Sequence, residues 1–205
     1  IPFIVVNRTP LTLPEIEKID SVIIDSYAGG YRALEHLYRL GHDRIAVIAG
    51  SMKTSTAQER TRGGQQALKD LGLKPSSRYF YECDYSWKKA SAAAKRLLEL
   101  DPRPTAVFAH DDSMALAVRE VILSENLRIP EDIALVGFDD IEFANLKGIE
   151  LTTISQKKYE MGTVATQILV NKIENRTVNM VNKVVLEAGL IIRRTCGYQL
   201  TGYLR

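Results

Sequence analysis

Four aspartates stand in two adjacent pairs, each directly after an apolar segment of the chain. Asp111 and Asp112 follow TAVFAH, and Asp139 and Asp140 follow IALVGF. Short apolar segments of this kind are typical of strands that are buried on both faces of a parallel sheet. In open α/β sheets, ligands bind in the crevice beyond the carboxyl ends of the strands. Both carboxylate pairs are therefore placed where polar groups that recognise a ligand are expected.

The elements that position these pairs alternate along the chain between apolar strands and amphipathic helices. This alternation predicts an α/β fold, a Rossmann-type doubly wound parallel sheet with helices on both faces. Residues 175–182 have the composition of an irregular polar loop. The predicted strands are residues 1–6, 21–24, 44–49, 79–84, 105–109, 133–138, 151–154 and 183–192, and the predicted helices are 27–40, 58–71, 88–100, 113–124 and 159–174.

These elements divide the chain unevenly. Residues 25–154 can form one complete doubly wound domain, whereas residues 1–24 and 155–189 supply only about two strands and one helix, which are marginal on their own in water. We expect these two flanks to form part of a second lobe. The chain starts without Met on the apolar segment IPFIVV, so we expect the other strands of that lobe to lie upstream in a longer polypeptide.

Composition excludes several classes of function. The 205 residues are 45% hydrophobic, enough for an ordinary core, and the net charge of +2 comes from 27 basic and 25 acidic residues without a concentrated basic block. Contact of this segment with nucleic acid is therefore not expected. Cys83 and Cys196 are far apart, match no metal-ligand spacing and are expected to be buried thiols of a reducing compartment. No apolar run approaches the roughly 18 residues that span a bilayer.

The sequence gives no support for catalysis. It contains no GxGxxG after a strand, no P-loop, no GxSxG elbow and no His/Cys cluster, so neither a cofactor nor a metal is expected. We interpret His36, His42 and His110 as structural residues. A pair such as Asp111 and Asp139 can in principle perform acid and base chemistry, but such pairs serve the recognition of sugar hydroxyls equally well. We therefore expect a binding protein and no enzyme.

Five motifs follow one another in order along the chain: HLYRLGHDRIAVIAG (36–50), ERTRGGQQALKDLGL (59–73), PTAVFAHDDSMAL (104–116), IPEDIALVGFDD (129–140) and LTTISQ (151–156). Together they resemble the effector-binding domain of the lactose-repressor/galactose-repressor (LacI/GalR) family of bacterial transcription regulators. The resemblance implies a periplasmic-binding-protein-like fold of two lobes, joined by three crossovers near Asp25, Gln156 and Gly189. It makes 25–154 and 190–205 the C-terminal lobe, and 1–24 with 155–189 part of the N-terminal lobe.

The resemblance also implies a function. A small effector would bind between the lobes and modulate operator DNA binding by a full-length cytoplasmic homodimer, through an N-terminal helix-turn-helix that is absent from this chain. The alternative is a periplasmic sugar-binding protein of a transporter, which shares the fold. The motif LGHDRIAVIAG favours the regulator.

The family's ligand-contacting positions fall on Arg60, Asp111, Asp139 and Gln156, with Asn7 and Tyr85 as secondary candidates. A guanidinium offers a rigid fork of donors, and a carboxylate accepts hydrogen bonds from paired hydroxyls or ring N–H groups. Tyrosine can supply a face for stacking. This chemistry suits a sugar or a nucleobase-like effector.

Each of these residues has a simpler alternative role. Arg60 begins a predicted helix and can form a surface ion pair with Glu59 or Asp70 instead. The aspartates can be caps, since Asp is favoured in turns and at helix N-termini. We expect the first member of each pair to face the ligand, and the second member, Asp112 or Asp140, to be the cap.

Three positions depart from the family pattern. Asp111 stands where the family usually has Asn, so the site loses a donor and gains a charge, which calls for a ligand with more donors or a compensating cation such as Arg60 or Arg62. Gly64 stands where an aromatic residue is common, and Lys157 where proline is common. These two changes predict a looser rim of the pocket.

Overall fold

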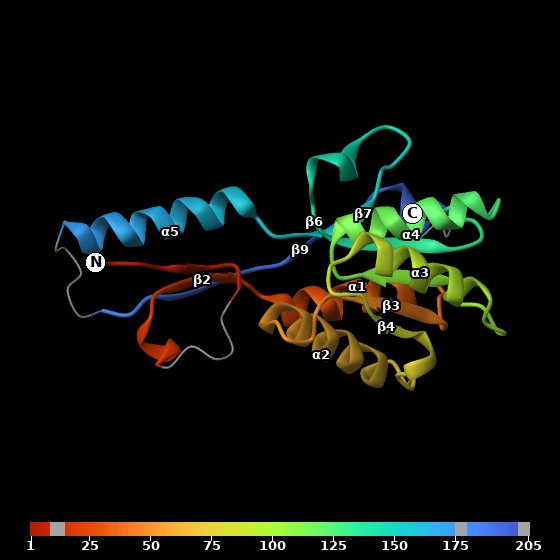
Figure 1. Cartoon of the computed structure of the whole chain (residues 1–205), viewed down its shortest axis with the longest axis horizontal. Coiled ribbons are helices and arrows are strands. Elements are labelled where there is room, and N and C mark those ends of the chain that lie inside the picture. Colours follow the sequence, from red (N-terminus) through yellow and green to blue (C-terminus); the bar gives the residue numbers. More distant parts are fainter. Residues whose placement is uncertain (9–14, 175–179, 201–205) are drawn as a thin grey trace.

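The computed structural model describes residues 1–8, 15–174 and 180–200, and its strands form two sheets that lie end to end along the long axis of the molecule (Figure 1). The large sheet has the order β4-β3-β5-β6-β7-β9, and the small sheet has the order β1-β2-β8. Their strands are β1 (Val5–Val6), β2 (Ser21–Ile24), β3 (Ile45–Ala49), β4 (Phe80–Glu82), β5 (Ala106–Ala109), β6 (Ala134–Asp139), β7 (Thr152–Ser155), β8 (Lys183–Leu186) and β9 (Gly189–Ile191).

Helices cover both faces of the large sheet, as the pattern of alternating elements predicts. Helices α1 (Ser26–Arg39) and α2 (Ser55–Asp70) pack on one face, and α3 (Trp87–Leu98) and α4 (Asp112–Ser124) on the other. Successive residues of β5 show the consequence, since Phe108 joins the core under α1 and Val107 joins the core under α4. Both faces of this strand are buried, which is why its sequence is apolar throughout.

The order of the strands reverses beside β3. The chain runs from β3 outward to β4, then returns across β3 to β5 and continues through β6 and β7, all in parallel pairs. A reversal of this kind opens a crevice at the carboxyl ends of the two strands that flank it. The carboxyl end of β5 leads directly into His110 and Asp111, so the topology places this segment at the crevice.

Helices α1 and α2 touch through glycines. A Cβ on Gly30 would lie 2.2 Å from the carbonyl oxygen of Arg60, and a Cβ on Gly63 would lie 2.0 Å from the carbonyl oxygen of Tyr27. Any larger residue at either position would push the two backbones apart. This close contact fixes the position of α2, and with it the position of Arg60.

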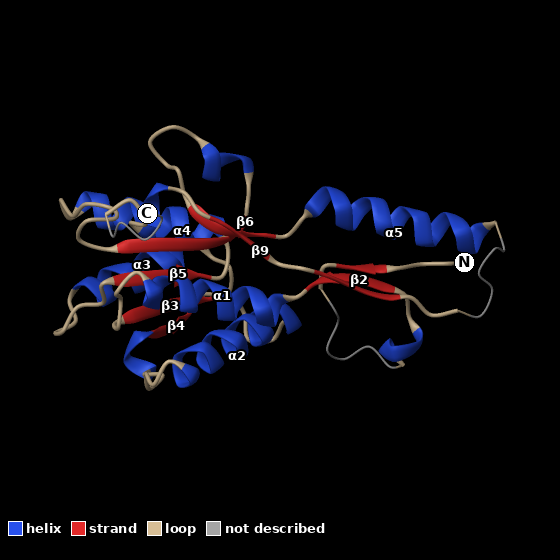
Figure 2. Ribbon diagram, turned by 180° about the vertical axis from the view of Figure 1, so that it is seen from behind, coloured by secondary structure: helices blue, strands red, loops and turns tan. Residues whose placement is uncertain are grey.

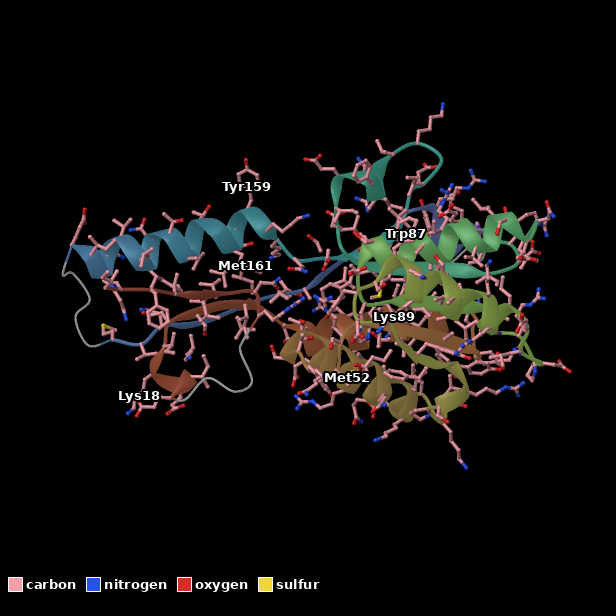
Figure 3. The ribbon with its side chains drawn as sticks, viewed as in Figure 1. Lys18, Met52, Trp87, Lys89, Tyr159 and Met161 are labelled. Atoms are coloured by element: carbon pink, nitrogen blue, oxygen red, sulfur yellow. The ribbon has the colours of Figure 1, made fainter. Side chains whose placement is uncertain are left out.

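The small sheet is covered by α5 (Lys158–Ile173), which lies along it (Figure 2). Met161 is 3% exposed and points toward the strands, whereas Tyr159 is 95% exposed and points away from them (Figure 3). The chain passes between the two sheets three times: after β2 at Asp25, after β7 at Gln156, and between β8 and β9. No helix in the described part of the chain is long and apolar enough to cross a membrane.

The predicted strand over residues 183–192 is wrong. It is two strands in different sheets: β8 pairs parallel with β2, and β9 pairs antiparallel with β7, the one antiparallel pair described in the large sheet. Arg32 holds the segment between them, because its guanidinium donates to the carbonyl oxygen of Ala188 at 2.5 Å and to Glu187 at 2.6 Å. The first predicted strand is also shorter than expected and keeps only Val5–Val6.

Two further sequence predictions concern residues outside the strands and helices. Cys83 and Cys196 are free and buried, as expected. Of the predicted polar loop over residues 175–182, positions 175–179 lie outside the described residues, as do positions 201–205 of the segment expected in the C-terminal lobe.

Candidate ligand-binding site between the two sheets

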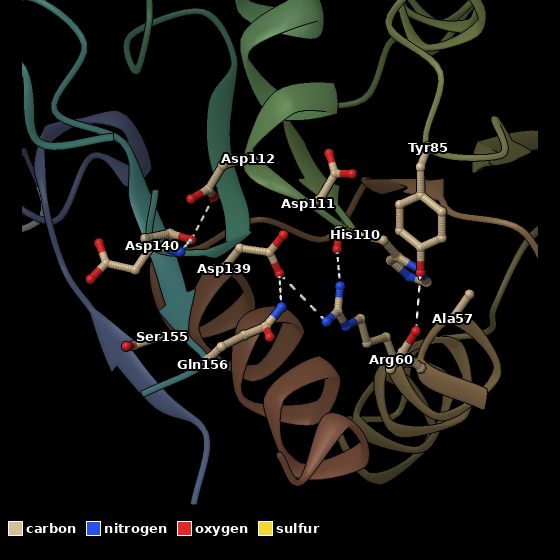
Figure 4. Close-up of polar contacts among 12 residues, drawn as sticks. Ala57, Arg60, Tyr85, His110, Asp111, Asp112, Asp139, Asp140, Ser155 and Gln156 are labelled. Atoms are coloured by element: carbon tan, nitrogen blue, oxygen red, sulfur yellow. Dashed lines mark hydrogen bonds and ion pairs between the residues drawn. The ribbon is translucent and has the colours of Figure 1, made fainter. Parts of the chain in front are cut away.

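Arg60 is the central residue of the candidate site. It lies on α2, is 3% exposed, and donates from Nη1 to the carbonyl oxygen of His110 (Figure 4). Its Nη2 lies 3.5 Å from Oδ1 of Asp139, and its guanidinium carbon lies 3.5 Å from the centroid of the Phe138 ring. The alternative of a surface ion pair is therefore wrong, because Arg60 is buried and its carboxylate partner is Asp139, at the end of β6.

Asp139 joins Arg60 to Gln156. Its Oδ1 accepts a hydrogen bond from Nε2 of Gln156, a residue that is 7% exposed and stands just after β7, where the chain leaves the large sheet. The backbone of Asp139 has φ 112°, a conformation that L-residues rarely adopt and that recurs at ligand sites. Three of the predicted site residues, from three separate segments, are thus joined by one ion pair and one hydrogen bond.

The structure makes Asp111, and not Asp112 as predicted, the cap of α4. Asp111 is the N-cap of α4 and accepts from the backbone N–H of Met114 at 2.6 Å. Asp112 is fully buried and accepts from the hydroxyl of Thr153 at 2.6 Å and from the backbone N–H of Ile141 at 2.9 Å. The helix begins one residue earlier than expected, and this shift turns the second carboxylate inward.

Asp140 is not a cap either. Its carboxylate accepts from Nη2 of Arg193 at 2.7 Å, and its backbone N–H donates to the hydroxyl of Thr153 at 3.4 Å. Both aspartates of the GFDD motif therefore bind arginines: Asp139 binds Arg60 on α2, and Asp140 binds Arg193 in the segment after β9. The pair fixes the exit of β6 from both sides.

Burial raises the pKa of two carboxyl groups in the site, and nearby arginines oppose that increase. Burial raises the pKa of Asp139, against the lowering effects of Arg60 and of the hydrogen bond from Gln156. Burial also raises the pKa of Asp111, which the hydrogen bond from Met114 and the charges of Arg60 and Arg8 lower. The compensating cations are therefore Arg60 and Arg8. Arg62, the other cation expected, forms an ion pair with Glu59 at 2.7 Å.

Tyr85 lies over the loop that follows β3. Its hydroxyl is 3.3 Å from the hydroxyl of Thr56 on α2, and a Cβ on Gly50 would lie 2.1 Å from its ring. The guanidinium of Arg8, from the segment after β1, stands 5.0 Å from the centroid of the same ring. Tyr85 thereby connects the large sheet with a residue that follows a strand of the small one.

Arg8 is the residue that sequence reasoning missed. In the sequence it is one arginine among many, and its partner is Tyr85, which is too distant along the chain for any local pattern to reveal. Its neighbour Asn7, a predicted site residue, has φ 67° and a buried side-chain oxygen without a hydrogen-bond partner among the described residues. The only available signal was the position of Arg8 next to Asn7.

A cleft of about 510 Å³ lies beside this group, between the carboxyl ends of β2 and β8 and the start of α2. Of the predicted residues only Asn7 lines it, and Thr56 in its wall connects it to Tyr85 through the hydrogen bond between their hydroxyls. The open cleft is therefore adjacent to the Arg60 group and does not contain it. Gly64 does not lie at this rim either, but faces a different cavity under α2.

Several buried polar atoms in or near the group have no hydrogen-bond partner in the described part of the chain. These are Nε of Arg60, both ring nitrogens of His110 and Oδ1 of Asn7. Burial, with the charge of Arg60 as a smaller cause, lowers the pKa of His110 well below its usual range, so the ring is neutral and offers one donor and one acceptor. Buried polar groups are nearly always hydrogen-bonded, so these atoms are available to a polar ligand or to water.

A model of the periplasmic binding protein-like domain matches residues 34–196. The chain therefore belongs to the family of periplasmic binding protein-like domains, and the predicted fold is confirmed. Within this family it is of the LacI/GalR type, as the proteins to which it is similar indicate.

The curated relatives are transcriptional repressors. Repressor PurR of Aliivibrio fischeri (strain MJ11) is 36% identical over 187 residues, which cover 88% of this chain and 56% of the relative. Repressor CytR of Escherichia coli (strain K12) is 34% identical over 180 residues, which cover 88% of this chain and 52% of the relative. The chain spans about half the length of the curated relatives it matches.

Solved structures give the same assignment. The transcriptional regulator CelR in complex with cellobiose superposes with a TM-score of 0.86 at 34% identity, covering 95% of this chain and 59% of that one. A regulatory protein of the LacI family from Chloroflexus aggregans superposes with a TM-score of 0.84 at 28% identity, covering 95% of this chain and 68% of that one. These similarities favour the regulator over the transporter protein, and the relatives are repressors and not enzymes.

Proposed function

We propose that this chain is the effector-sensing domain of a LacI-type bacterial transcription regulator. The observation that carries the proposal is the group formed by Arg60, Asp139 and Gln156 at the carboxyl edge of the large sheet, where the chain crosses to the small sheet. A binding role fits this group better than a catalytic one, because the two carboxylates nearest Arg60 are already engaged by a helix N-terminus and by an amide.

The division into lobes is part of the proposal. Residues 25–154 and 190–205 form the C-terminal lobe around the large sheet, and residues 1–24 and 155–189 form part of the N-terminal lobe around the small sheet. The supporting observation is the membership of the strands, since β1, β2 and β8 pair only with one another in the described part of the chain. The effector binds between these lobes.

The proposed mechanism is a linkage between two arrangements of the lobes. Arg60 and Asp139 offer fixed donors and acceptors from the large sheet, whereas Asn7 and Arg8 stand on the segment that leaves the small sheet. A ligand that contacts both sets favours the arrangement in which they are close. Its effect equals its differential affinity for the two arrangements, and such couplings are typically about 1–3 kcal/mol.

The operator would be bound by an N-terminal helix-turn-helix of the full-length protein, which acts as a homodimer in the cytoplasm. This part of the proposal rests on the relatives, which are repressors about twice as long as the matched segment. The chain itself carries no dense basic patch in its sequence, in agreement with a sensing role. Gel filtration and operator binding by the full-length protein test this part directly.

The effector is a sugar or a nucleobase-like molecule. Arg60 and the neutral ring of His110 supply donors, while Asp111 and Asp139 supply acceptors that suit paired hydroxyls or ring N–H groups. One neighbouring structure holds cellobiose and another, from Enterococcus faecium, holds ribose. A calorimetric panel of cellobiose, ribose, nucleobases and nucleosides identifies the class, and the lack of any saturable binding would count against the site.

The substitution Arg60→Ala tests the site in the full-length protein. We expect it to abolish the response to the effector while operator affinity remains unchanged, because Arg60 contacts only the core of the sensing domain. Folding must be measured separately, since removal of one partner of a buried ion pair typically costs about 3–5 kcal/mol.

Arg119→Ala is the matched control, because Arg119 also donates to a backbone carbonyl, that of Gly148, but is only partly buried and stands on α4 away from the group. The control should respond like the wild type. A normal effector response in folded Arg60→Ala protein would remove Arg60 from the binding site.

A further inference from the structure

A second cavity, of about 220 Å³, lies between α2 and the strands β3, β4 and β5. Its floor is formed by side chains of the core, among them Leu34, Leu68 and Phe108, which are at most 8% exposed. Its exposed lining residues, Gln65 and the segment 75–77, mark the mouth. Apart from Arg60, the residues of the candidate effector site do not line it.

One of the residues that line the cavity, at position 64, has no side chain. Gly64 is buried in the middle of α2 and lines the cavity, and a Cβ there would lie 3.2 Å from the end of the Leu34 side chain and 3.7 Å from the carbonyl oxygen of Gly30. Gly30 and Gly63 differ from it, because a Cβ on either would collide with backbone. Helix contact therefore requires glycine at 30 and 63 but not at 64. A glycine inside a helix costs about 1 kcal/mol relative to alanine, so the third glycine needs another explanation.

The lining indicates what the cavity can hold. Tyr79, Phe80 and Phe108 contribute aromatic rings beside aliphatic side chains, and polar side chains complete the wall: Arg60, Thr61, Gln65, Ser76 and Ser77. Aromatic pairs gain energy beyond their area of contact. An apolar cavity of about 150 Å³ is large enough to bind benzene, so this one, of about 220 Å³, accommodates an aromatic ring. We infer that the cavity under α2 is a binding site for a small aromatic molecule with a hydroxyl or amino group at its mouth.

This site shares a wall with the Arg60 group. Arg60 lines the cavity one helical turn before Gly64, and the ring of Phe108 lies 5.4 Å from that of His110, whose carbonyl accepts from Arg60. An aromatic molecule under α2 thus contacts two residues that support the effector site. Its binding does not depend on the proposed function, because the cavity is complete without an effector or DNA.

The test is a titration of the methyl-labelled chain with phenol and with cyclohexanol, followed by NMR. We expect saturable shifts of the methyl groups of Leu34, Val47 and Leu68 with phenol, and binding of cyclohexanol that is weaker by about threefold or more, since the contacts with the aromatic wall are lost. Gly64→Leu should fill the cavity and weaken phenol binding at least about tenfold. Gly162→Leu is the control, because Gly162 is also helical but stands on α5 with open space around it.

The absence of saturable shifts in the wild-type chain, or equal phenol affinity in folded Gly64→Leu protein, would overturn the inference. If Gly64→Leu does not fold, Gly64→Ala adds a single methyl group and should weaken phenol binding about twofold to threefold. Intermolecular NOEs in the unmodified chain decide the location independently of any substitution. Contacts from phenol to Leu34 and Leu68 support the site, and contacts confined to other residues refute it.

Discussion

Asp112 is expected to make the stability of this protein fall as the pH rises. Its carboxylate is fully buried, and this burial, only partly offset by the hydrogen bonds from Thr153 and Ile141, raises its pKa from 3.8 to about 7. The folded protein therefore keeps the proton over a range in which the unfolded chain has lost it. A carboxyl with a raised pKa contributes its full stability below pH 4, and this contribution is lost as the pH rises to 7.

The magnitude follows from the two pKa values. Each unit of difference corresponds to 1.36 kcal/mol, and between pH 5 and pH 8 the difference of about three units lowers the free energy of unfolding by about 2–3 kcal/mol. Asp112→Asn removes this titration. The free energy of unfolding of both proteins is measured with urea at pH 5 and at pH 8. Relative to the wild type, the variant should be more stable at pH 8 than at pH 5 by about 2–3 kcal/mol.

Asp132→Asn serves as the control for this experiment. Asp132 is bound by Arg128 at the surface, which lowers its pKa to about 2, so it stays ionised throughout this interval. Its substitution should shift the free energy of unfolding by the same amount at pH 5 and pH 8. A difference between Asp112→Asn and the wild type that does not change between the two pH values would refute the reasoning, and would mean that Asp112 is ionised in the folded state at pH 5.

Two further predictions concern the exit of β6. Asp139→Asn should weaken effector binding by about tenfold, which is the contribution of one hydrogen bond to a charged group, while the new amide still accepts from Gln156. Calorimetry of both proteins with the same effector measures this. Wild-type affinity would limit Asp139 to a structural role. Gly137→Ala should lower the free energy of unfolding by about 1–3 kcal/mol, because its Cβ would lie 2.2 Å from Oδ1 of Asp112. Urea unfolding beside Gly162→Ala, where the added methyl group meets open space, isolates that clash, and equal stability of the two variants would contradict it.

Much of the fold was predictable because its signals are local. The strands β3, β5 and β6 are short apolar segments, and positive-φ glycines follow α1 and α2 at 41 and 72, where the sequence pattern places the helix ends. The split of residues 183–192 was not predictable, because VVLEAGLII has strand-forming residues on both sides of the crossing. What divides it is Arg32, which binds Glu187 and Ala188 from α1.

The candidate site shows the same limit at the level of single residues. The GFDD and TISQ motifs end adjacent strands of one sheet, so the proximity of Asp139 and Gln156 follows from topology. Which aspartate of 111 and 112 turns inward depends on a shift of one residue in the start of α4, and a sequence pattern does not resolve such a shift. The contact of Arg8 with Tyr85 joins two segments by tertiary packing alone.

The contacts of the site separate residues that hold a ligand from residues that transmit its presence. Arg60 is bound only within the large sheet, by the carbonyl of His110, by Asp139 and by the face of Phe138. Arg8 instead follows β1 and meets the large sheet through the ring of Tyr85. We therefore expect a change in the relative position of the sheets to alter the Arg8 contact more than the Arg60 contacts, and coupling between effector and lobe arrangement to depend on the residues after β1.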